Sequence, residues 1–348
     1  TTCGQACHFQ SLSGTEPKMK ENYMKKYDVV ALGEILIDFT FAGTNADGKK
    51  LYEENPGGAP ANCVSAVAKL GGRGAFIGMT GRDSFGEDVR RVLEKINVDT
   101  SGMRYCDSQH TTLAFVSLDQ KGERHFSFCR NPGADTQLSV DDLNRDVLES
   151  TEILHIGSLS LTTEPSKSAT QAAVNLVKEA GGFISYDPNY RESLWGGRAD
   201  GISLIKSMIP LTDILKISEE ELFLLYNNYD GENPHEKIAR EILSCGPKLV
   251  LITLGSKGVF YAFKNLAGDV DCGRVESRKV SVVDTTGAGD SFNGGLLYRL
   301  TRRKNPFSFS RQELEEDLTF ANTVAALCVS KRGAIPALPT LAEVKSLL

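Results

Sequence analysis

The stretch DTTGAGDSF, residues 284–292, joins a β-rich run at residues 280–283 to an apolar-periodic helix. Gly287 and Gly289 carry no Cβ, so the main chain can turn sharply there and come close to a ligand. The following helix directs unpaired N–H groups and the positive end of its dipole at one point, which suits a phosphate. Asp290, the only carboxylate in the first turn, is placed to accept a proton from an attacking hydroxyl. The same residues also fit a plain strand-to-helix turn with Asp290 as the N-cap.

A second glycine turn precedes a helix nearer the start of the chain. The segment PGGAPAN, residues 56–62, leads into apolar residues at helical spacing and is closed by a Gly-Gly pair. Gly57 and Gly58 again let the backbone approach a ligand, and Asn62 projects an amide beside them. From the spacing alone, a loop and a helix without any ligand fit equally well.

Short apolar runs alternate with helical patterns along most of the chain, which predicts an α/β fold with a mostly parallel, buried sheet. The first strand is expected at residues 28–33, and Asp38 follows its exit, where ligands of open parallel sheets gather. A hairpin pattern interrupts this rhythm within residues 108–130, around a turn at residues 119–122. Together with a strand at residues 38–41, it is expected to form a small sheet that closes over a site and excludes water.

Three later segments carry local information. Residues 248–253 form a near-continuous apolar run, which predicts a central, parallel strand. Ser218 and Glu221 have the spacing of a capping box at a helix start. The segment DPNYR leaves a strand end, and the planar guanidinium of Arg191 there suits sugar oxygens or a carboxylate. A surface arginine on a proline turn is the alternative interpretation of that segment.

Two of these motifs resemble the two signatures of the ribokinase-like (pfkB) family of sugar kinases. DTTGAGDSF resembles the C-terminal signature, and the run GGAPANCVSAVAKLGGRGAFIGMTGRDSFG resembles the N-terminal one. FISYDPNYRESLW resembles the fructokinase and ketodeoxygluconate-kinase branch of the family. The resemblance extends from about residue 27 to residue 348. It implies a ribokinase-like three-layer fold with a β-sheet lid, whose strands lie near residues 36–55 and 108–130, and it leaves residues 1–26 as a poorly ordered extension.

The resemblance also implies roles for particular residues. Asp290 is the expected catalytic base, and Gly287, Ala288 and Gly289 supply the anion hole. The expected sugar-binding residues are Asp38, Gly57, Gly58, Asn62, Phe128, Arg130 and Arg191. The expected nucleotide-binding residues are Lys216, Glu221, Thr253, Gly255, Gly258 and Asn322. Glu221 would hold Mg²⁺ through water, although Ser218 replaces the asparagine of the family motif, and a K⁺ pocket would use the carbonyls of Asp284, Thr286, Cys328, Lys331 and Gly333.

Composition excludes several other classes of protein. The 348 residues are 41% apolar and 24% charged, with a net charge of −6 and no basic stripe interleaved with aromatic residues, which disfavours nucleic acid as a partner. No apolar run approaches the ~18 residues of a membrane span. Six of the eight cysteines are scattered singly among apolar neighbours, as expected for reduced core thiols in the cytoplasm. Cys3 and Cys7, with His8, lack the further ligands that a metal site needs.

Neither a P-loop motif nor the GxGxxG spacing of a dinucleotide enzyme is present. The expected function is therefore ATP- and Mg²⁺-dependent phosphorylation of a sugar, with fructose converted to fructose 6-phosphate. Two alternatives stay open, a 2-keto-3-deoxygluconate kinase in which Arg130 and Arg191 bind the substrate carboxylate, and a non-catalytic sugar-binding regulator. Phe115, Phe126 and Phe128 supply more apolar surface than a lid needs, which predicts a homodimer through the lid.

Overall fold

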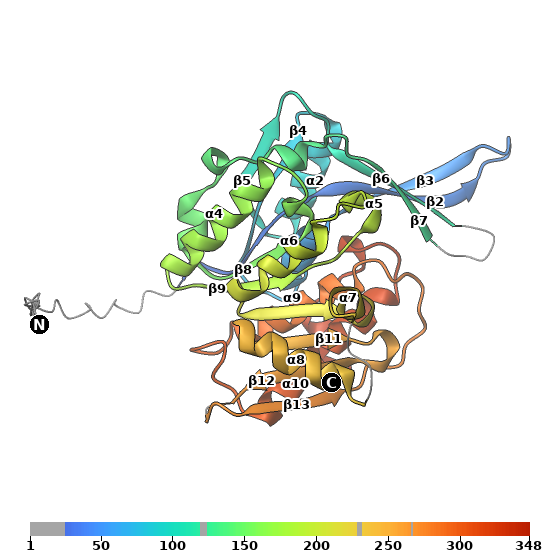
Figure 1. Cartoon of the computed structure of the whole chain (residues 1–348). Helices are drawn as coiled ribbons and strands as arrows, with labels where there is room; N and C mark the ends of the chain where they lie inside the picture. Colours follow the sequence, from blue (N-terminus) through green and yellow to red (C-terminus); the bar gives the residue numbers. More distant parts are fainter. Residues whose placement is uncertain (1–24, 119–123, 228–231, 266) are drawn as a thin grey trace, which may run out of the picture.

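The chain folds into a nine-stranded sheet between two layers of helices, with a smaller sheet projecting from one edge (Figure 1). The structure is a computed structural model, and it describes residues 25–118, 124–227, 232–265 and 267–348. The expected extension, apart from Lys25 and Lys26, and the expected hairpin turn at residues 119–122 lie outside the described residues. In the described ranges, no helix is both long enough and apolar enough to cross a membrane.

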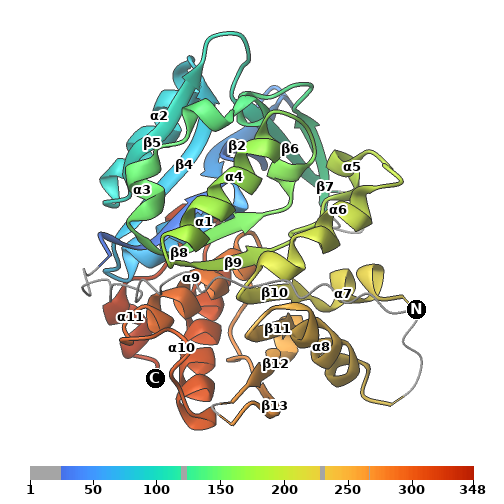
Figure 2. The ribbon, with the colours of Figure 1, turned by 60° about the vertical axis from the view of Figure 1, so that its left-hand side comes forward.

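The strand order of the large sheet is β13-β12-β11-β10-β9-β8-β1-β4-β5. Its strands are β1 (Tyr27–Leu32), β4 (Gly74–Gly81), β5 (Asp99–Cys106), β8 (Thr151–Gly157), β9 (Phe183–Asp187), β10 (Ile214–Ser218), β11 (Leu249–Thr253), β12 (Val259–Lys264) and β13 (Val270–Val275). All pairs from β5 to β11 are parallel, whereas β11, β12 and β13 pair antiparallel. The colours of Figures 1 and 2 show the N-terminal half of the chain on one side of the molecule and the C-terminal third on the other.

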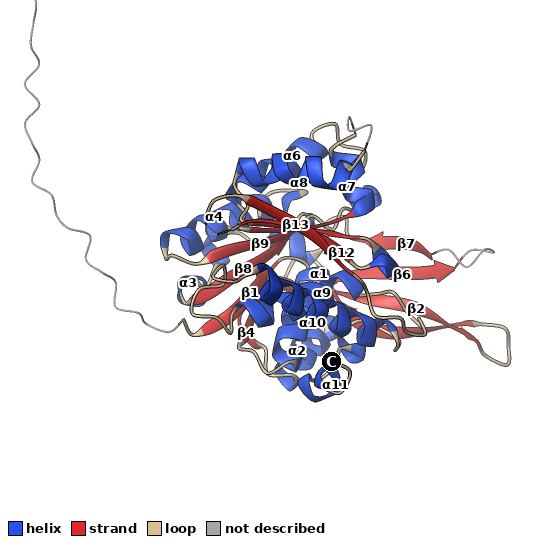
Figure 3. Ribbon diagram, turned by 90° about the horizontal axis from the view of Figure 1, so that it is seen from below, coloured by secondary structure: helices blue, strands red, loops and turns tan. Residues whose placement is uncertain are grey.

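Helices cover both faces of this sheet (Figure 3). One layer holds α3 (Arg145–Glu149), α4 (Ser166–Glu179), α6 (Gly201–Ser207), α7 (Glu219–Leu225) and α8 (Pro234–Cys245). The other holds α1 (Ala59–Lys69), α2 (Ser84–Lys95), α9 (Ala288–Leu300), α10 (Arg311–Val329) and α11 (Leu341–Lys345). A short helix, α5 (Glu192–Trp195), follows the β9 exit.

Both faces of the central strands are apolar, and this explains why the sheet is buried. In β1 the side chains of Val30 and Leu32 pack in one hydrophobic core, whereas Val29 and Ala31 belong to the cores on the opposite face. Successive side chains of a strand point to opposite faces, so a continuous apolar run needs a helix layer on each side. The predicted three-layer α/β fold is confirmed.

The lid is a four-stranded sheet with the order β3-β2-β6-β7. Its strands are β2 (Leu36–Thr44), β3 (Lys50–Gly57), β6 (Thr112–Leu118) and β7 (Arg124–Cys129). Strand β2 pairs antiparallel with β3 and parallel with β6, and β6 pairs antiparallel with β7. The predicted small sheet, built from a hairpin and the strand after Asp38, is therefore present.

Three local predictions were wrong. Residues 280–283 form no strand, and Val282 and Val283 are 60% and 54% exposed, because no neighbouring strand pairs with them. Strand β11 is parallel only to β10 and lies third from one edge of the sheet, not at its centre. Among the six described cysteines, which are all free, Cys129 and Cys245 are exposed, so their apolar sequence neighbours did not place them in the core.

Candidate active site

A cavity of about 740 Å³ opens where the carboxyl ends of β9, β10 and β11 meet the lid and the first turn of α9. Parallel strands leave their carboxyl ends at one edge of the sheet, so the loops that follow them converge there. The wall combines lid residues, the Gly58–Asn62 turn and the whole 285–290 stretch. The two glycine turns, more than 200 residues apart in the sequence, thus face the same space.

The N-terminus of α9 holds the three residues of the predicted anion cradle. Gly287 is the N-cap residue with φ 76°, and a Cβ there would lie 2.9 Å from the Ala334 Cβ, so this position requires glycine. Gly289 is already within the helix, where its backbone does not need positive φ. The turn therefore depends on Gly287 alone, and the sequence-based expectation that Gly289 also turns the chain was wrong.

Asp290 lies in the first turn of α9 and is fixed by an amide from the other glycine turn. The Asn62 Nδ2 donates to Asp290 Oδ2 over 2.8 Å. Burial raises the pKa of Asp290 from 3.8 to about 6, and the nearby Asp187 adds to this, against the hydrogen bond from Asn62. A carboxylate with a pKa just below neutrality is ionised at neutral pH and still basic enough to accept a proton.

A buried ammonium group lies beside the cradle. Lys216 is 7% exposed, and its Nζ donates to Asp187 Oδ2 over 2.9 Å. Asn293, one turn after Asp290, donates to the same oxygen over 2.9 Å. Burial lowers the pKa of Lys216, but Asp187, Glu221 and Asp290 outweigh it and the net pKa is raised, so the group is charged. A Cβ on Gly289 would lie 2.9 Å from this Nζ, which places the positive charge next to the helix N-terminus.

On the lid side, Asp38 faces the cavity close to the first glycine turn. A Cβ on Gly57 would lie 2.7 Å from Asp38 Oδ2, so a larger residue at position 57 would clash with this carboxylate. Burial raises the pKa of Asp38 to about 7, and the charge of Asp290 raises it further, whereas Arg191 lowers it. Two carboxylates, Asp38 and Asp290, thus influence each other across the cavity.

Comparison with known proteins assigns the family. The family model described as "pfkB family carbohydrate kinase" matches residues 26–341. The chain belongs to the pfkB family of carbohydrate kinases.

Related sequences and solved structures of other proteins agree with that assignment. This pfkB kinase is 44% identical over 317 residues to the probable fructokinase-6, chloroplastic, of Arabidopsis thaliana, covering 90% of this chain and 80% of the relative. The fructokinase of Xylella fastidiosa with bound ATP superposes with a TM-score of 0.84 at 32% identity, covering 92% of this chain and 98% of that one. A double mutant of the Vibrio cholerae O395 fructokinase, in its fructose-, ADP- and potassium-bound form, gives 0.81 at 33% identity, with 93% and 99% covered.

Most predicted site residues meet on the wall of the cavity. These are Asp38, Gly58, Asn62, Phe128, Arg191, Lys216, Glu221, Thr253, Gly255, Thr286, Gly287, Ala288, Gly289 and Asp290. The wall does not include Gly57, Arg130, Gly258, Asn322, Asp284, Cys328, Lys331 or Gly333. The roles of all these residues in the pfkB kinase stay predictions.

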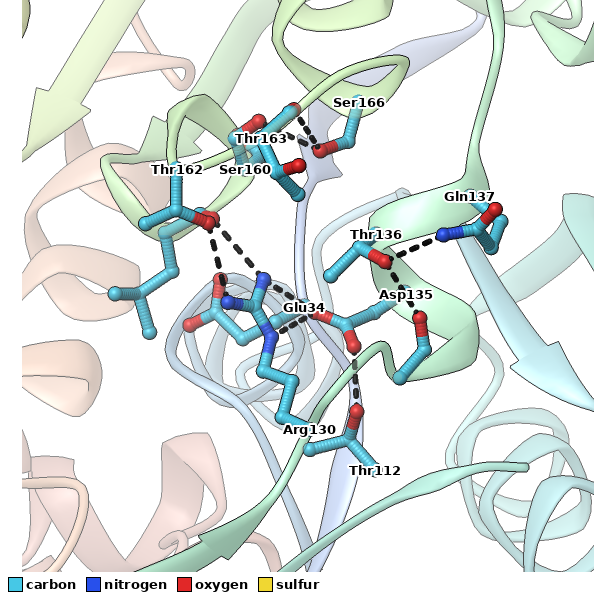
Figure 4. Close-up of polar contacts among 12 residues, drawn as sticks. Glu34, Thr112, Arg130, Asp135, Thr136, Gln137, Ser160, Thr162, Thr163 and Ser166 are labelled. Atoms are coloured by element: carbon cyan, nitrogen blue, oxygen red, sulfur yellow. Dashed lines mark hydrogen bonds and ion pairs between the residues drawn. The ribbon is translucent and has the colours of Figure 1, made fainter. Parts of the chain in front are cut away.

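Arg130 is not among the residues that line the cavity, and its guanidinium lies against Asp135 and Thr162 (Figure 4). The side chain is 5% exposed and pairs with Asp135, with 2.8 Å from Nε and 2.7 Å from Nη2 to Oδ2. Nη1 donates to Thr162 Oγ1 over 3.2 Å, and Nη2 donates to the Leu159 carbonyl over 3.0 Å. With these donors engaged inside the protein, Arg130 is not positioned to bind a substrate carboxylate.

Glu221 combines the predicted capping box with a place on the cavity wall. Its Oε2 accepts from the Ser218 N and Oγ over 2.9 and 2.8 Å, and the Ser218 Oγ accepts from the Glu221 N. Its Oε1 accepts from the Tyr190 N over 2.6 Å, which ties the DPNYR turn to α7. The capping box is confirmed, and Oε1, which accepts one hydrogen bond, retains a lone pair for a water molecule.

Two predicted nucleotide residues hold the backbone behind the cavity. Gly258 has φ 92°, and a Cβ there would lie 2.0 Å from the Val275 carbonyl oxygen, so it packs against β13. The Asn322 Nδ2 donates to the carbonyls of Val275 and Glu276 over 3.3 and 3.1 Å. Both residues therefore position the segment after β13, which the sequence patterns did not indicate.

The segment predicted to bind a monovalent cation is folded into one loop cluster. Asp284 accepts from the Thr286 N over 2.8 Å and from the Gly333 N over 3.0 Å. The Lys331 Nζ turns away to Glu343, over 2.9 Å. In the described parts of the chain, no group of three or more His, Cys, Asp or Glu side chains is arranged around a metal position. A cation here would rely on carbonyl oxygens.

Sequence reasoning assigned no role to several residues that shape the cavity. Glu34 and Leu159 are part of the wall, and Asp187 and Asn293 position Lys216. Asp187 ends β9 in the DPNYR motif, and Asn293 lies three residues after Asp290 on the same helix face, so both had a detectable pattern. Glu34 had only its place after the first strand.

Proposed function

We propose that this kinase transfers the γ-phosphoryl group of ATP to the primary hydroxyl of fructose, giving fructose 6-phosphate. One observation carries the proposal: Asp290, the first turn of α9 and the Lys216 ammonium converge on a single cavity that Asn62, bonded to Asp290, and Asp38 also line. The fructokinase relatives and structures support fructose as the acceptor.

In the proposed reaction, Asp290 accepts the proton of the attacking hydroxyl while Asn62 holds its carboxylate in place. The amides at the start of α9 and the Lys216 ammonium lie where negative charge would develop on the transferring phosphoryl group. Asp187 and Asn293 fix that ammonium, so little reorganisation is needed during the reaction. The lid limits the access of water, which would otherwise take the phosphoryl group.

We propose Mg²⁺ as the divalent ion, held by Glu221 through water, since this carboxylate lines the cavity and its Oε1 has a free lone pair. Bound Mg²⁺ supplies charge neutralisation between the phosphates. K⁺ would bind the carbonyls of the 284–286 and 328–333 segments, and the potassium-bound form of the Vibrio cholerae O395 fructokinase supports potassium as the ion. Dialysis against a chelator, then titration of each ion separately into the ADP-release assay, tests both.

The alternative acceptor, 2-keto-3-deoxygluconate, loses one of its two proposed carboxylate partners because Arg130 is engaged by Asp135. Arg191 still lines the cavity with an exposed guanidinium. The test compares kcat/KM for both sugars on one preparation and on Arg191→Lys by coupled ADP detection. A parent enzyme that prefers the acid, with this preference lost in Arg191→Lys, would overturn the choice of fructose. The alternative of a non-catalytic sugar-binding regulator is disfavoured, because such a protein should lack Asp290 or the glycine cradle at residues 287–289, and this chain has both.

We also propose a homodimer through the lid and a cytoplasmic location. Leu51 and Tyr52 are 48% and 38% exposed on lid strand β3, and Phe39 and Phe115 stack at 5.1 Å on the neighbouring strands. The side chain of Phe126, the third phenylalanine of this predicted surface besides Phe115 and Phe128, lies outside the described part of the structure. Sedimentation at micromolar concentration tests the dimer, and a monomer would contradict it. The free thiols in the described residues fit a reducing compartment, which localisation of a tagged protein would check.

A further inference from the structure

Glu34 is a buried carboxylate on the cavity wall that uses only one of its two oxygens. It follows β1, is 3% exposed, and its Oε1 accepts from the Ala59 N over 3.1 Å. Its Oε2 has no hydrogen-bond partner among the described residues. Leaving such an oxygen unpaired is costly, and buried polar groups without partners are rare in folded proteins.

The surrounding protein does not supply the missing partner. Figure 4 shows Arg130 next to Glu34, but the guanidinium donates to Asp135, Thr162 and the Leu159 carbonyl. Asp135 also accepts from the Thr112 Oγ1 over 2.5 Å. The Arg130–Asp135 pair therefore has its hydrogen-bond partners in the protein and does not bond to Glu34. Burial raises the pKa of Glu34 to about 7; Arg130 lowers it by charge alone and Asp135 raises it.

A second unpartnered acceptor lies on the same wall. The Asn62 Oδ1 is buried without a partner, and its amide orientation is fixed because Nδ2 donates to Asp290. Other buried side-chain atoms without partners in the described chain belong to Ser65, Thr80, Arg90, Ser160 and Arg303, none of which lines the cavity. Only Glu34 and Asn62 combine an unpaired acceptor with a place in the site, on either side of the Gly58–Ala59 turn.

We propose that Glu34 Oε2 binds a hydroxyl of the sugar and selects substrates that carry this hydroxyl against deoxy sugars. The inference rests on the proposed function and adds a specificity residue to it. A hydroxyl group can donate to a carboxylate and can accept from a carboxylic acid, so it satisfies Glu34 in either protonation state. A deoxy sugar leaves the oxygen unpaired, which reduces kcat/KM. 2-Keto-3-deoxygluconate lacks both the 1- and the 3-hydroxyl of fructose, so the same carboxylate rejects it if Glu34 binds either of these.

The test measures kcat, KM and kcat/KM for fructose and its 1-, 3- and 4-deoxy analogues by coupled ADP release. With the parent enzyme we expect one analogue to lose about ten- to hundred-fold in kcat/KM relative to fructose. In Glu34→Ala, which removes the acceptor, that penalty should fall to within about three-fold, while KM for ATP stays unchanged. If Glu34→Ala does not fold, Glu34→Gln replaces it in the test, because it keeps an oxygen for the Ala59 N. In Glu34→Gln the penalty should be at least three-fold smaller than in the parent.

Thr80→Val is the matched control, because it removes a buried hydroxyl that is also unpartnered but lies away from the cavity. Its deoxy penalties should equal those of the parent. The inference is overturned if no analogue loses more than three-fold with the parent, or if the Glu34 variants lower kcat/KM for all sugars by one common factor, since Glu34 would then only hold the turn. A parent enzyme that does not phosphorylate fructose would instead refute the proposed function.

Discussion

Replacing Asp290 by asparagine should sharply reduce turnover and stabilise the protein at the same time. The change keeps the size of the side chain and keeps an oxygen to accept from the Asn62 Nδ2, which now lies 2.8 Å from Oδ2. It removes the group that accepts the proton. We expect kcat to fall by about 10² to 10⁴ with KM for ATP little changed, the range that general-base assistance contributes.

The stability gain follows from the pKa of this group. Burial raises the pKa of Asp290 from 3.8 to about 6, so the folded protein binds the proton more tightly than the unfolded chain does. The associated stability is fully present below about pH 4 and is lost as the pH rises through about 6. At pH 8 the ionised carboxylate therefore costs up to roughly 3 kcal/mol, less where cavity water screens it. Asp290→Asn avoids this cost.

Two assays on one preparation check both parts. Urea unfolding should show the variant more stable than the parent by about 1 to 3 kcal/mol at pH 8 and equal to it near pH 4. The parent kcat/KM for the sugar should fall about ten-fold per pH unit below about pH 6, and the residual activity of the variant should not follow that profile. Asp47→Asn, an exposed carboxylate far from the cavity wall, serves as the control and should change neither quantity. Turnover within a few-fold of the parent, or a variant less stable at pH 8, would refute the reasoning.

The remaining predictions concern the cradle and the buried ion pair. Gly289→Val should fold but lose most of its kcat, because the new Cβ would lie 2.9 Å from the Lys216 Nζ and displace this ammonium; normal turnover would show that the ammonium position does not matter. Gly287→Ala should instead cost about 1 to 2 kcal/mol of unfolding free energy, measured in urea, since φ there is 76°. Arg130→Met should cost about 3 to 5 kcal/mol by leaving Asp135 buried and unpaired, without changing the preference between fructose and 2-keto-3-deoxygluconate. A changed preference between the two sugars would show that Arg130 takes part in substrate binding.

Local sequence patterns determined the elements that depend on neighbours in the chain. The capping box of Ser218 and Glu221, the turn at Gly287 and the apolar runs of the central strands were all predictable, whereas the N-cap is Gly287 and not Asp290. Each rests on interactions over three or four residues or on a repeating side-chain period. The residues of the two glycine motifs, in this order along the chain, were enough for the resemblance to the pfkB family, which the family model then showed.

The tertiary structure decided which side chains meet and which are already engaged. Asn62 and Asp290 are 228 residues apart, and Asp187 and Asn293 are 106 apart, so no local pattern could pair them. The same holds for residues 280–283, whose β-branched side chains form a strand only where another strand offers partners. Arg130 and Glu34 show the consequence most clearly. A guanidinium binds whichever carboxylate the fold brings closest, here Asp135, and this leaves the second oxygen of Glu34 without a partner.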